Sequence, residues 1–265
     1  MSIGLRARVE GPDVIPPLLL LHELGGSSAS FRWLVRELAD RRTVAVDLPG
    51  SGKSPLLAAD ASGIADHAEA VWCFARETIG QPVVIVGVAF GAALGAIVAA
   101  RHPKDVAGLV YCCMGPDIPL DTQRFLLERN GIVERQGMGR VVDLSLERSF
   151  PSSLRREREE VFAEYAADLS AARRDGYVRQ SKALACAGDR IRSSLASLRA
   201  PVAVVAGRQD GHFTPAVMRE LSTIVHDLTA MESIDDCAHL PHVQAPARLA
   251  AITRDLVRRL EEVRT

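Results

Sequence analysis

Short aliphatic runs recur along this chain, and most of them lead into a turn or a helical stretch. The clearest run, residues 82–88 (PVVIVGV), continues directly into the small-residue stretch 90–101. Apolar runs of this length, bounded by turn residues, are typical of strands buried on both faces. Further strands are expected at 17–22, 43–47, 106–112, 201–206 and within 227–234, and helices at 64–79, 90–101 and 246–263. The alternation predicts an α/β fold with a mostly parallel sheet and helices on both faces.

The segment between Gly115 and about Arg199 interrupts this alternation. It contains no strand-like run, it is rich in arginine and glutamate, and its pattern indicates helices; LRREREE at 154–160 is most simply a solvated helix face. Strand and helix patterns resume after it. We therefore expect an α/β core formed by residues 1–115 and 196–265, and a helical cap formed by residues 116–195.

Composition argues against several classes of partner. Lys and Arg total 32 and Asp and Glu total 33, a net charge of −1, and aromatic residues make up 5% of the chain. A nearly neutral chain has no general attraction for nucleic acid or for anionic membranes. The aliphatic runs are also far shorter than the roughly 20 residues of a membrane helix. We expect a small-molecule partner and neither nucleic acid nor membrane, and we leave the oligomeric state open.

The N-terminal sequence and the cysteines indicate a compartment. MSIGLRARVEGPD has no apolar region of the kind found in signal peptides. The five cysteines are scattered and include no CxxC motif. Free thiols in a reducing environment are the simplest interpretation, so we expect a cytoplasmic protein.

Gly52-Lys53-Ser54 imitates the end of a phosphate-binding P-loop. A true P-loop has a glycine five residues before the glycine of Gly-Lys-Ser, and Asp47 occupies that position. Pro55 and a loose stretch follow, so the sequence predicts no helix N-terminus to hold a phosphate. We interpret the segment as a turn after a strand, and we expect no cofactor.

The strongest functional signal lies where the 82–88 run meets the next helix. Residues 87–91 (GVAFG) have the form of a nucleophile elbow, G-x-S-x-G, in which a tight strand-to-helix turn lifts the central side chain above the sheet. The central residue here is Ala89, whose methyl group cannot attack a substrate. Taken alone, Ala89 could be a small residue at an ordinary strand–helix junction.

The other members of a nucleophile–acid–histidine triad follow in the order that α/β-hydrolases use. Asp210 comes just after the 201–206 run, and His239 comes after the last expected strand. The sequence leaves alternatives for both positions: Asp235 and Asp236 for the acid, and His212 and His242 for the histidine. A metal site formed by His239 and His242 with Asp235 or Asp236 is conceivable, but the proline-containing loop offers no third histidine nearby, and we expect no metal.

The loop after the first aliphatic run could complete an oxyanion site. Residues 22–26 (HELGG) offer one backbone N–H from Leu24, and Phe90, directly after the elbow, offers another. His22 and Glu23 lie in the same loop and are candidate substrate-binding residues, although His22 is more simply a structural loop residue.

Together, five segments resemble the α/β-hydrolase superfamily over nearly the whole chain. They are HELGGS at 22–27, DLPGSGKS at 47–54, GVAFG at 87–91, GRQDGHFTP at 207–215 and CAHLPHVQAP at 237–246. Two stretches of the insertion, 136–148 and 176–189, resemble 3-oxoadipate enol-lactonases. The resemblance implies a cofactor-free hydrolase of a small ester, lactone or related acyl compound, with a serine at position 89, His239 as base and Asp210 as its partner.

The chain departs from the family pattern at three positions. Ser149 stands where the lactonase pattern has tryptophan, which implies a different pocket. Glu23 replaces a glycine and brings a carboxylate near the expected oxyanion site. Ala89 either marks a variant whose nucleophile was replaced to trap a ligand, or a protein that has lost hydrolysis and kept its pocket. We favour the first, because an intact Asp210 and His239 would have little reason to persist in a protein without activity.

Two other functions remain open on the same residues. One is a ligand-binding pseudoenzyme, and the other is cleavage of a carbon–carbon bond beside a carbonyl. The insertion also carries Arg140 and Arg148 in its best-matching stretch, and the two-pronged guanidinium of either could bind a substrate carboxylate. A surface ion pair is the simpler explanation for each of them singly.

Overall fold

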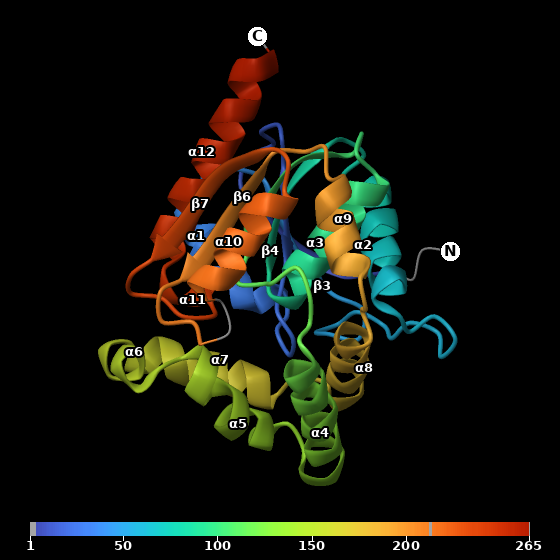
Figure 1. Cartoon of the computed structure of the whole chain (residues 1–265), viewed down its shortest axis with the longest axis vertical. Coiled ribbons are helices and arrows are strands. Elements are labelled where there is room, and N and C mark those ends of the chain that lie inside the picture. Colours follow the sequence, from blue (N-terminus) through green and yellow to red (C-terminus); the bar gives the residue numbers. More distant parts are fainter. Residues whose placement is uncertain (1–3, 212–213, 265) are drawn as a thin grey trace.

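A seven-stranded sheet runs through the centre of the computed structural model, which describes residues 4–211 and 214–264 (Figure 1). The strand order is β1-β3-β2-β4-β5-β6-β7, and neighbouring strands are parallel except that β1 runs antiparallel to β3. The strands are β1 Arg6–Glu10, β2 Leu18–Leu21, β3 Thr43–Asp47, β4 Val83–Val88, β5 Val106–Cys112, β6 Val202–Gly207 and β7 Leu228–Ile234. The predicted α/β class with a mostly parallel sheet is confirmed.

The central strands are aliphatic because both faces of the sheet are covered. Every residue of β2, β3, β4 and β6 is buried. In the parallel register, Leu21 lies opposite Gly87 and Gly87 opposite Tyr111, so that β2, β4 and β5 end at one edge of the sheet. Loops that leave the carboxyl ends of parallel strands meet at such an edge, where α/β proteins bind ligands.

Helices lie on both faces of the sheet, as predicted. α2 (Ile64–Thr78), α3 (Phe90–Arg101) and α9 (Arg190–Ser197) cover one face, with α10 (Pro215–Ile224) beside α9. The other face is covered by α1 (Arg32–Glu37) and α12 (Pro246–Arg264), with the short α11 (Pro241–Gln244) beside them and η1 (Ser28–Phe31) leading into α1. None of the described helices combines the length and the apolar composition that crossing a bilayer requires.

A separate group of helices follows β5 and lies beyond the carboxyl ends of the strands (Figure 1). It contains α4 (Leu120–Gln136), α5 (Gly139–Ser149), α6 (Ser152–Glu157), α7 (Glu159–Ser170) and α8 (Arg174–Ala185), which we call the helical insertion. The insertion shares an apolar cluster with Leu240 and Val243 of the core. Most of α9 falls within the expected cap range of 116–195, but α9 packs on α3, in the helical layer of the core.

The DLPGSGKS segment is a turn to which the insertion is attached. The Asp47 carboxylate accepts hydrogen bonds from the backbone N–H groups of Ser28 (2.7 Å) and Lys53 (2.9 Å) and so fixes the turn. Gln180 of α8 donates its side-chain N–H to the carbonyl of Pro49 (2.9 Å). The segment therefore holds α8 against the core, and no helix follows it before α2.

Candidate active site

Ala89 occupies the sharp turn between β4 and α3. Its φ is 49° and its ψ is −112°, a backbone conformation that residues other than glycine rarely adopt. The turn is fixed on both sides: the Ala89 N–H donates to the carbonyl of Cys112 (2.9 Å), and the Ala89 carbonyl accepts from Ala92 (3.0 Å). Strained backbone of this kind persists only where the surrounding structure holds it, and it concentrates at functional sites.

The glycine after the turn lets α3 approach the sheet closely. A Cβ atom at Gly91 would lie 2.0 Å from the carbonyl oxygen of Leu21, which is part of the backbone of β2. No larger residue fits without moving the helix away from the strand. Close packing of α3 on β2 therefore requires the glycine at position 91 of the G-x-A-x-G motif. The positive φ at Ala89 is a separate constraint on the same turn.

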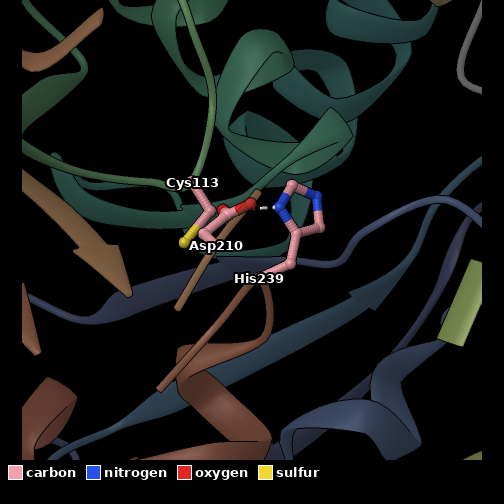
Figure 2. A group of neighbouring side chains, drawn as sticks. All are labelled: Cys113, Asp210 and His239. Atoms are coloured by element: carbon pink, nitrogen blue, oxygen red, sulfur yellow. Dashed lines mark hydrogen bonds and ion pairs between the residues drawn. The ribbon is translucent and has the colours of Figure 1, made fainter. Parts of the chain in front are cut away.

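Asp210 and His239 are brought together by the loops after β6 and β7. The His239 Nδ1 lies 2.8 Å from Asp210 Oδ2, and the other ring nitrogen, Nε2, points away from the carboxylate (Figure 2). Burial alone would lower the pKa of His239, but the carboxylate of Asp210 outweighs it and raises the pKa above the usual histidine value. The pair therefore has the geometry of a base and the group that orients it.

The alternative residues have other surroundings. Asp235 is exposed and pairs with Arg208 at 2.5 Å, and Asp236 is exposed too. His242 is completely buried, with its Nε2 at 3.1 Å from Glu23 Oε2. His212 lies outside the described residues. Among the described candidates, His239 and Asp210 make the one histidine–aspartate contact at the carboxyl edge of the sheet.

The Glu23 carboxylate, which was unexplained in the sequence, has protein partners on both oxygens. Oε2 faces His242, and Oε1 accepts hydrogen bonds from the Tyr165 hydroxyl (2.9 Å) and the Ser30 hydroxyl (3.2 Å). Burial would raise the pKa of Glu23, but the charge and hydrogen bond of His242 outweigh it and lower the pKa to about 2. The carboxylate in the loop of residues 22–26 thus has its partners within the protein.

His22 is also fully buried, and both of its ring nitrogens bind backbone. Nε2 accepts the N–H of Leu48 (3.1 Å), so Nδ1 carries the proton and donates it to the carbonyl of Glu23 (2.7 Å). Burial lowers the pKa of His22. His22 is not among the described residues that line the cavity, contrary to the expectation that it contacts substrate.

A cavity of about 300 Å³ lies between the sheet edge and the helical insertion. Its lining is mainly apolar and includes, from the core, Glu23, Leu24, Ala89, Phe90, Cys113 and His239. The Phe90 N–H belongs to the first turn of α3, where helix N–H groups have no partner within the helix. The cavity therefore brings together the elbow, the histidine and both residues expected to form the oxyanion site.

Two arginines of the insertion line the same cavity. Arg148, at the end of α5, was expected there; the buried Arg129 of α4 was not. Both guanidinium groups stack on the ring of Phe125, at 5.2 Å for Arg148 and 5.0 Å for Arg129. Arg140 instead pairs with Asp143 at 2.6 Å on the exposed side of α5, which corrects its expected place at the cavity.

Cys113 was also missed from the sequence, where the five cysteines, including the adjacent Cys112 and Cys113, were interpreted only as free thiols. Both are buried, but Cys113 has a positive φ of 52° and lies beside Asp210 and His239 (Figure 2). Burial, together with the charge of Asp210, raises the pKa of the Cys113 thiol well above its usual value. The sequence did offer one signal for Cys113, which is its position directly after β5, the strand that pairs with β4.

Comparison with known proteins decides the family. A sequence profile described as the alpha/beta hydrolase fold matches residues 16–246. The chain belongs to the alpha/beta hydrolase fold family. Residues 16–246 of this alpha/beta hydrolase include six of the seven strands, β2 to β7, and the whole helical insertion. The resemblance inferred from the five sequence segments is confirmed.

Solved structures show the same fold. A thermophilic esterase from Thermogutta terrifontis superposes with a TM-score of 0.85 at 22% identity, covering 97% of this chain and 93% of that one. The enol-lactonase from Burkholderia xenovorans LB400 superposes with a TM-score of 0.86 at 20% identity, covering 96% of each chain. At such identities the similarity shows the shared architecture alone.

Curated relatives match this alpha/beta hydrolase over shorter stretches. The magnesium-chelatase 30 kDa subunit of Rhodobacter capsulatus is 32% identical over 151 residues, and the pimeloyl-[acyl-carrier protein] methyl ester esterase of Shewanella sp. (strain MR-7) is 30% identical over 121 residues. The matches cover 51% and 43% of this chain, and span 53% and 39% of the two relatives.

Proposed function

We propose that the protein is built as a hydrolase of a small ester, lactone or related acyl compound, with position 89 as the place of the nucleophile. The observation that carries this is the conformation of Ala89, held at a φ of 49° in the wall of the cavity that His239 also lines. An alanine has no need of this strained turn, whereas a serine hydroxyl would be presented by it toward the cavity.

With serine at position 89, the residues around the cavity account for acyl transfer. His239 Nε2 would take the proton of the hydroxyl as it attacks the substrate carbonyl, and Asp210 would hold the proton on Nδ1 and stabilise the imidazolium. The N–H groups of Leu24 and Phe90 would bind the developing oxyanion, an effect worth about 3 kcal/mol for each donor. No metal or cofactor takes part in these steps.

Ala89 leaves this chain without that hydroxyl. We propose that it is the nucleophile-to-alanine form of an active hydrolase, because the histidine–aspartate pair and the strained turn are both retained. In this form a substrate can occupy the cavity without forming an acyl intermediate.

We further propose that the substrate carries a carboxylate, bound by Arg129 and Arg148. Both guanidinium groups lie over the ring of Phe125, and all three residues line the cavity. Burial lowers the pKa of Arg129, so an anionic ligand in the cavity would favour its charged form. Arginine suits this task because its fork of donors matches both oxygens of a carboxylate.

The Ala89→Ser variant tests the catalytic proposal. It should be labelled covalently by a fluorophosphonate and should show burst kinetics with an activated ester, whereas the parent chain should show neither. Adding His239→Ala should reduce kcat by several orders of magnitude, as loss of the base does in other triads. A folded Ala89→Ser protein without labelling or turnover would favour the ligand-binding pseudoenzyme.

Arginine replacements test the substrate class. In the Ala89→Ser background, Arg129→Met and Arg148→Met should each raise KM for a short acidic ester at least tenfold, which corresponds to about 1.4 kcal/mol. KM for the neutral methyl ester of the same compound should change much less. Arg140→Met is the matched control, since Arg140 lies in the same insertion but outside the cavity lining. Equal KM effects on the acidic and the neutral ester would refute the carboxylate site.

We place the protein in the cytoplasm on the basis of its thiols. All five cysteines are free, and Cys112 and Cys113 are adjacent buried thiols that form no disulfide. Free thiols of this kind are typical of a reducing compartment.

A further inference from the structure

Three metal-ligating side chains converge at the carboxyl edge of the sheet. Cys113 follows β5, Asp210 follows β6 and His239 follows β7, and one donor atom of each lies within 4.8 Å of the other two (Figure 2). Among the side chains that the structure describes, this is the one group of three such ligands close enough to share an ion. The thiol of Cys113 has no role in the acyl transfer that we propose for His239 and Asp210.

We propose that Cys113, Asp210 and His239 form a binding site for a thiophilic divalent cation of the Zn²⁺ class. Thiolate, imidazole and carboxylate are all ligands of zinc, at distances of about 2.0 to 2.3 Å. Ligands around a tetrahedral ion at those distances are roughly 3 to 4 Å apart. The donor separations below 4.8 Å therefore need only small side-chain shifts to enclose an ion.

Charge balance favours the ion at this buried place. The side chain of Asp210 has no exposed surface, and Cys113 is 2% exposed. A cation of charge +2 would be matched by one thiolate and one carboxylate, with the imidazole neutral, so that the occupied site has no net charge. A buried group of charges is tolerated when it is balanced in this way.

The protons can be accounted for explicitly. Binding breaks the S–H bond of Cys113 and releases that proton to solvent. It also removes the proton from His239 Nδ1, because the ion takes the place of the N–H···O bond to Asp210. A doubly protonated His239 releases this proton, whereas a neutral ring moves it to Nε2. One or two protons therefore leave for each ion bound, and no oxidation occurs.

The occupied site would stop His239 from acting as a base. With the metal on Nδ1, the neutral ring carries its remaining proton on Nε2, the nitrogen that would otherwise accept one from position 89. The cation would thus compete with the catalytic state rather than assist it. This site goes beyond the proposed hydrolysis, and its existence can be tested in the present Ala89 chain, which needs no activity.

Cadmium provides the direct measurement, because a cadmium–thiolate bond has a charge-transfer band in the ultraviolet. The protein is first freed of metal with a chelator and carries Cys186→Ser, which removes the exposed thiol. One equivalent of Cd²⁺ should produce the band. Calorimetric titration with Zn²⁺ should show one bound ion per chain. The observed heat should differ between buffers of different ionisation enthalpy, because the buffer takes up the released protons.

Matched cysteine variants then assign the site. Cys113→Ser should abolish the cadmium band and weaken Zn²⁺ binding at least about tenfold, and Asp210→Asn should weaken Zn²⁺ binding by a similar factor. Cys112→Ser, the neighbouring buried thiol in β5, should keep both the band and the affinity.

Circular dichroism checks that each variant is folded, and Asp210→Asn replaces Cys113→Ser if the latter does not fold. The proposal is overturned if the folded parent gives no band, if the band survives in folded Cys113→Ser, or if Asp210→Asn binds Zn²⁺ as tightly as the parent.

Discussion

Among the described residues, Ala89 and Cys113 are the two non-glycine residues with positive φ, and they follow neighbouring strands. Each is fixed by a ladder-like hydrogen bond to the next strand: Ala89 N–H to Cys112 and Cys113 N–H to the carbonyl of Val205, both 2.9 Å. Strain of this kind costs about 1 to 3 kcal/mol for each residue. Both side chains reach the cavity as a result.

The raised pKa of His239 predicts a pH profile. In the Ala89→Ser enzyme, kcat/KM should fall as the pH drops through a value above the usual histidine pKa, because protonated His239 cannot accept the serine proton. Asp210→Asn removes the charge that raises this pKa, so the midpoint of the profile should move to lower pH while the maximal rate falls. The pH dependence of kcat/KM for both enzymes measures this. An unmoved midpoint would show that another group titrates.

The sequence could predict that Ala89, Asp210 and His239 lie at one edge of the sheet, because each belongs to a local motif that follows a strand. Arg129 and Cys113 were not predicted, since nothing local distinguishes a buried arginine of α4 from the solvated arginines around it. Their placement depends on how the insertion packs over the sheet, which a single sequence does not encode in any short pattern. Glu23 was recognised as unusual, but its partners could not be predicted. Tyr165 is 142 residues away in the chain, and Ser30 belongs to no recognisable motif.

At the scale of elements, the insertion rests on the core through a contact between two glycines. A Cβ atom at Gly176, in the first turn of α8, would lie 1.9 Å from the carbonyl oxygen of Gly50. Gly50 itself has a φ of +88° in the turn after β3. The backbone of α8 therefore touches the backbone of the core, and Gln180 adds its hydrogen bond to Pro49 one turn further on.

Gly176→Ala should disturb this contact. The added methyl group forces α8 away from the turn, and we expect a loss of roughly 1 to 3 kcal/mol in the free energy of unfolding, as in other overpacked sites. Urea unfolding followed by circular dichroism measures the loss. Gly139→Ala is the control, because a Cβ atom there meets nothing within 4 Å and should leave stability unchanged or slightly higher. Equal stability of the two variants would contradict the close contact.

Most strands were predictable because burial on both faces gives them an uninterrupted aliphatic sequence. β3, β5 and α3 have the predicted bounds, and β2, β4, β6 and β7 differ from them by a residue or two at their ends. β1 was not predicted: its sequence RARVE carries charges, since β1 lies at the edge of the sheet and is largely exposed. Helical boundaries within the insertion were beyond the sequence pattern, because polar helices of this kind lack a sharp apolar period.

At the scale of the whole molecule, Glu23 connects three parts of the fold that are remote from one another in the sequence. Its carboxylate contacts Tyr165 of the insertion, His242 of α11 and Ser30 of η1. The loop of residues 22–26, the insertion and the helices η1 and α11 therefore meet at one buried carboxylate. Removing one partner of a buried pair usually costs about 3 to 5 kcal/mol, because the remaining charge is left uncompensated.

The lowered pKa of Glu23 predicts how this centre responds to acid. The folded-state pKa of about 2 lies below the ordinary value of 4.5, so the stabilisation is complete above 4.5 and is lost as the pH falls toward 2. Urea unfolding should show Glu23→Gln less stable than the parent by on the order of 3 kcal/mol at pH 6, with a difference that narrows below pH 4.5. The exposed Glu128→Gln should show no such convergence. A difference that stays constant with pH would refute the assignment.

The bend at position 89 also bears on how the gene for this protein can change. Every alanine codon becomes a serine codon by one substitution, G to U, in its first base. The turn keeps its shape with a methyl group in place, and Ser30, Ser51 and Ser54 show that small hydroxyl side chains are readily buried near this edge of the sheet. A gene that encodes this sequence is therefore one point mutation from placing a hydroxyl in the wall of the cavity that His239 also lines.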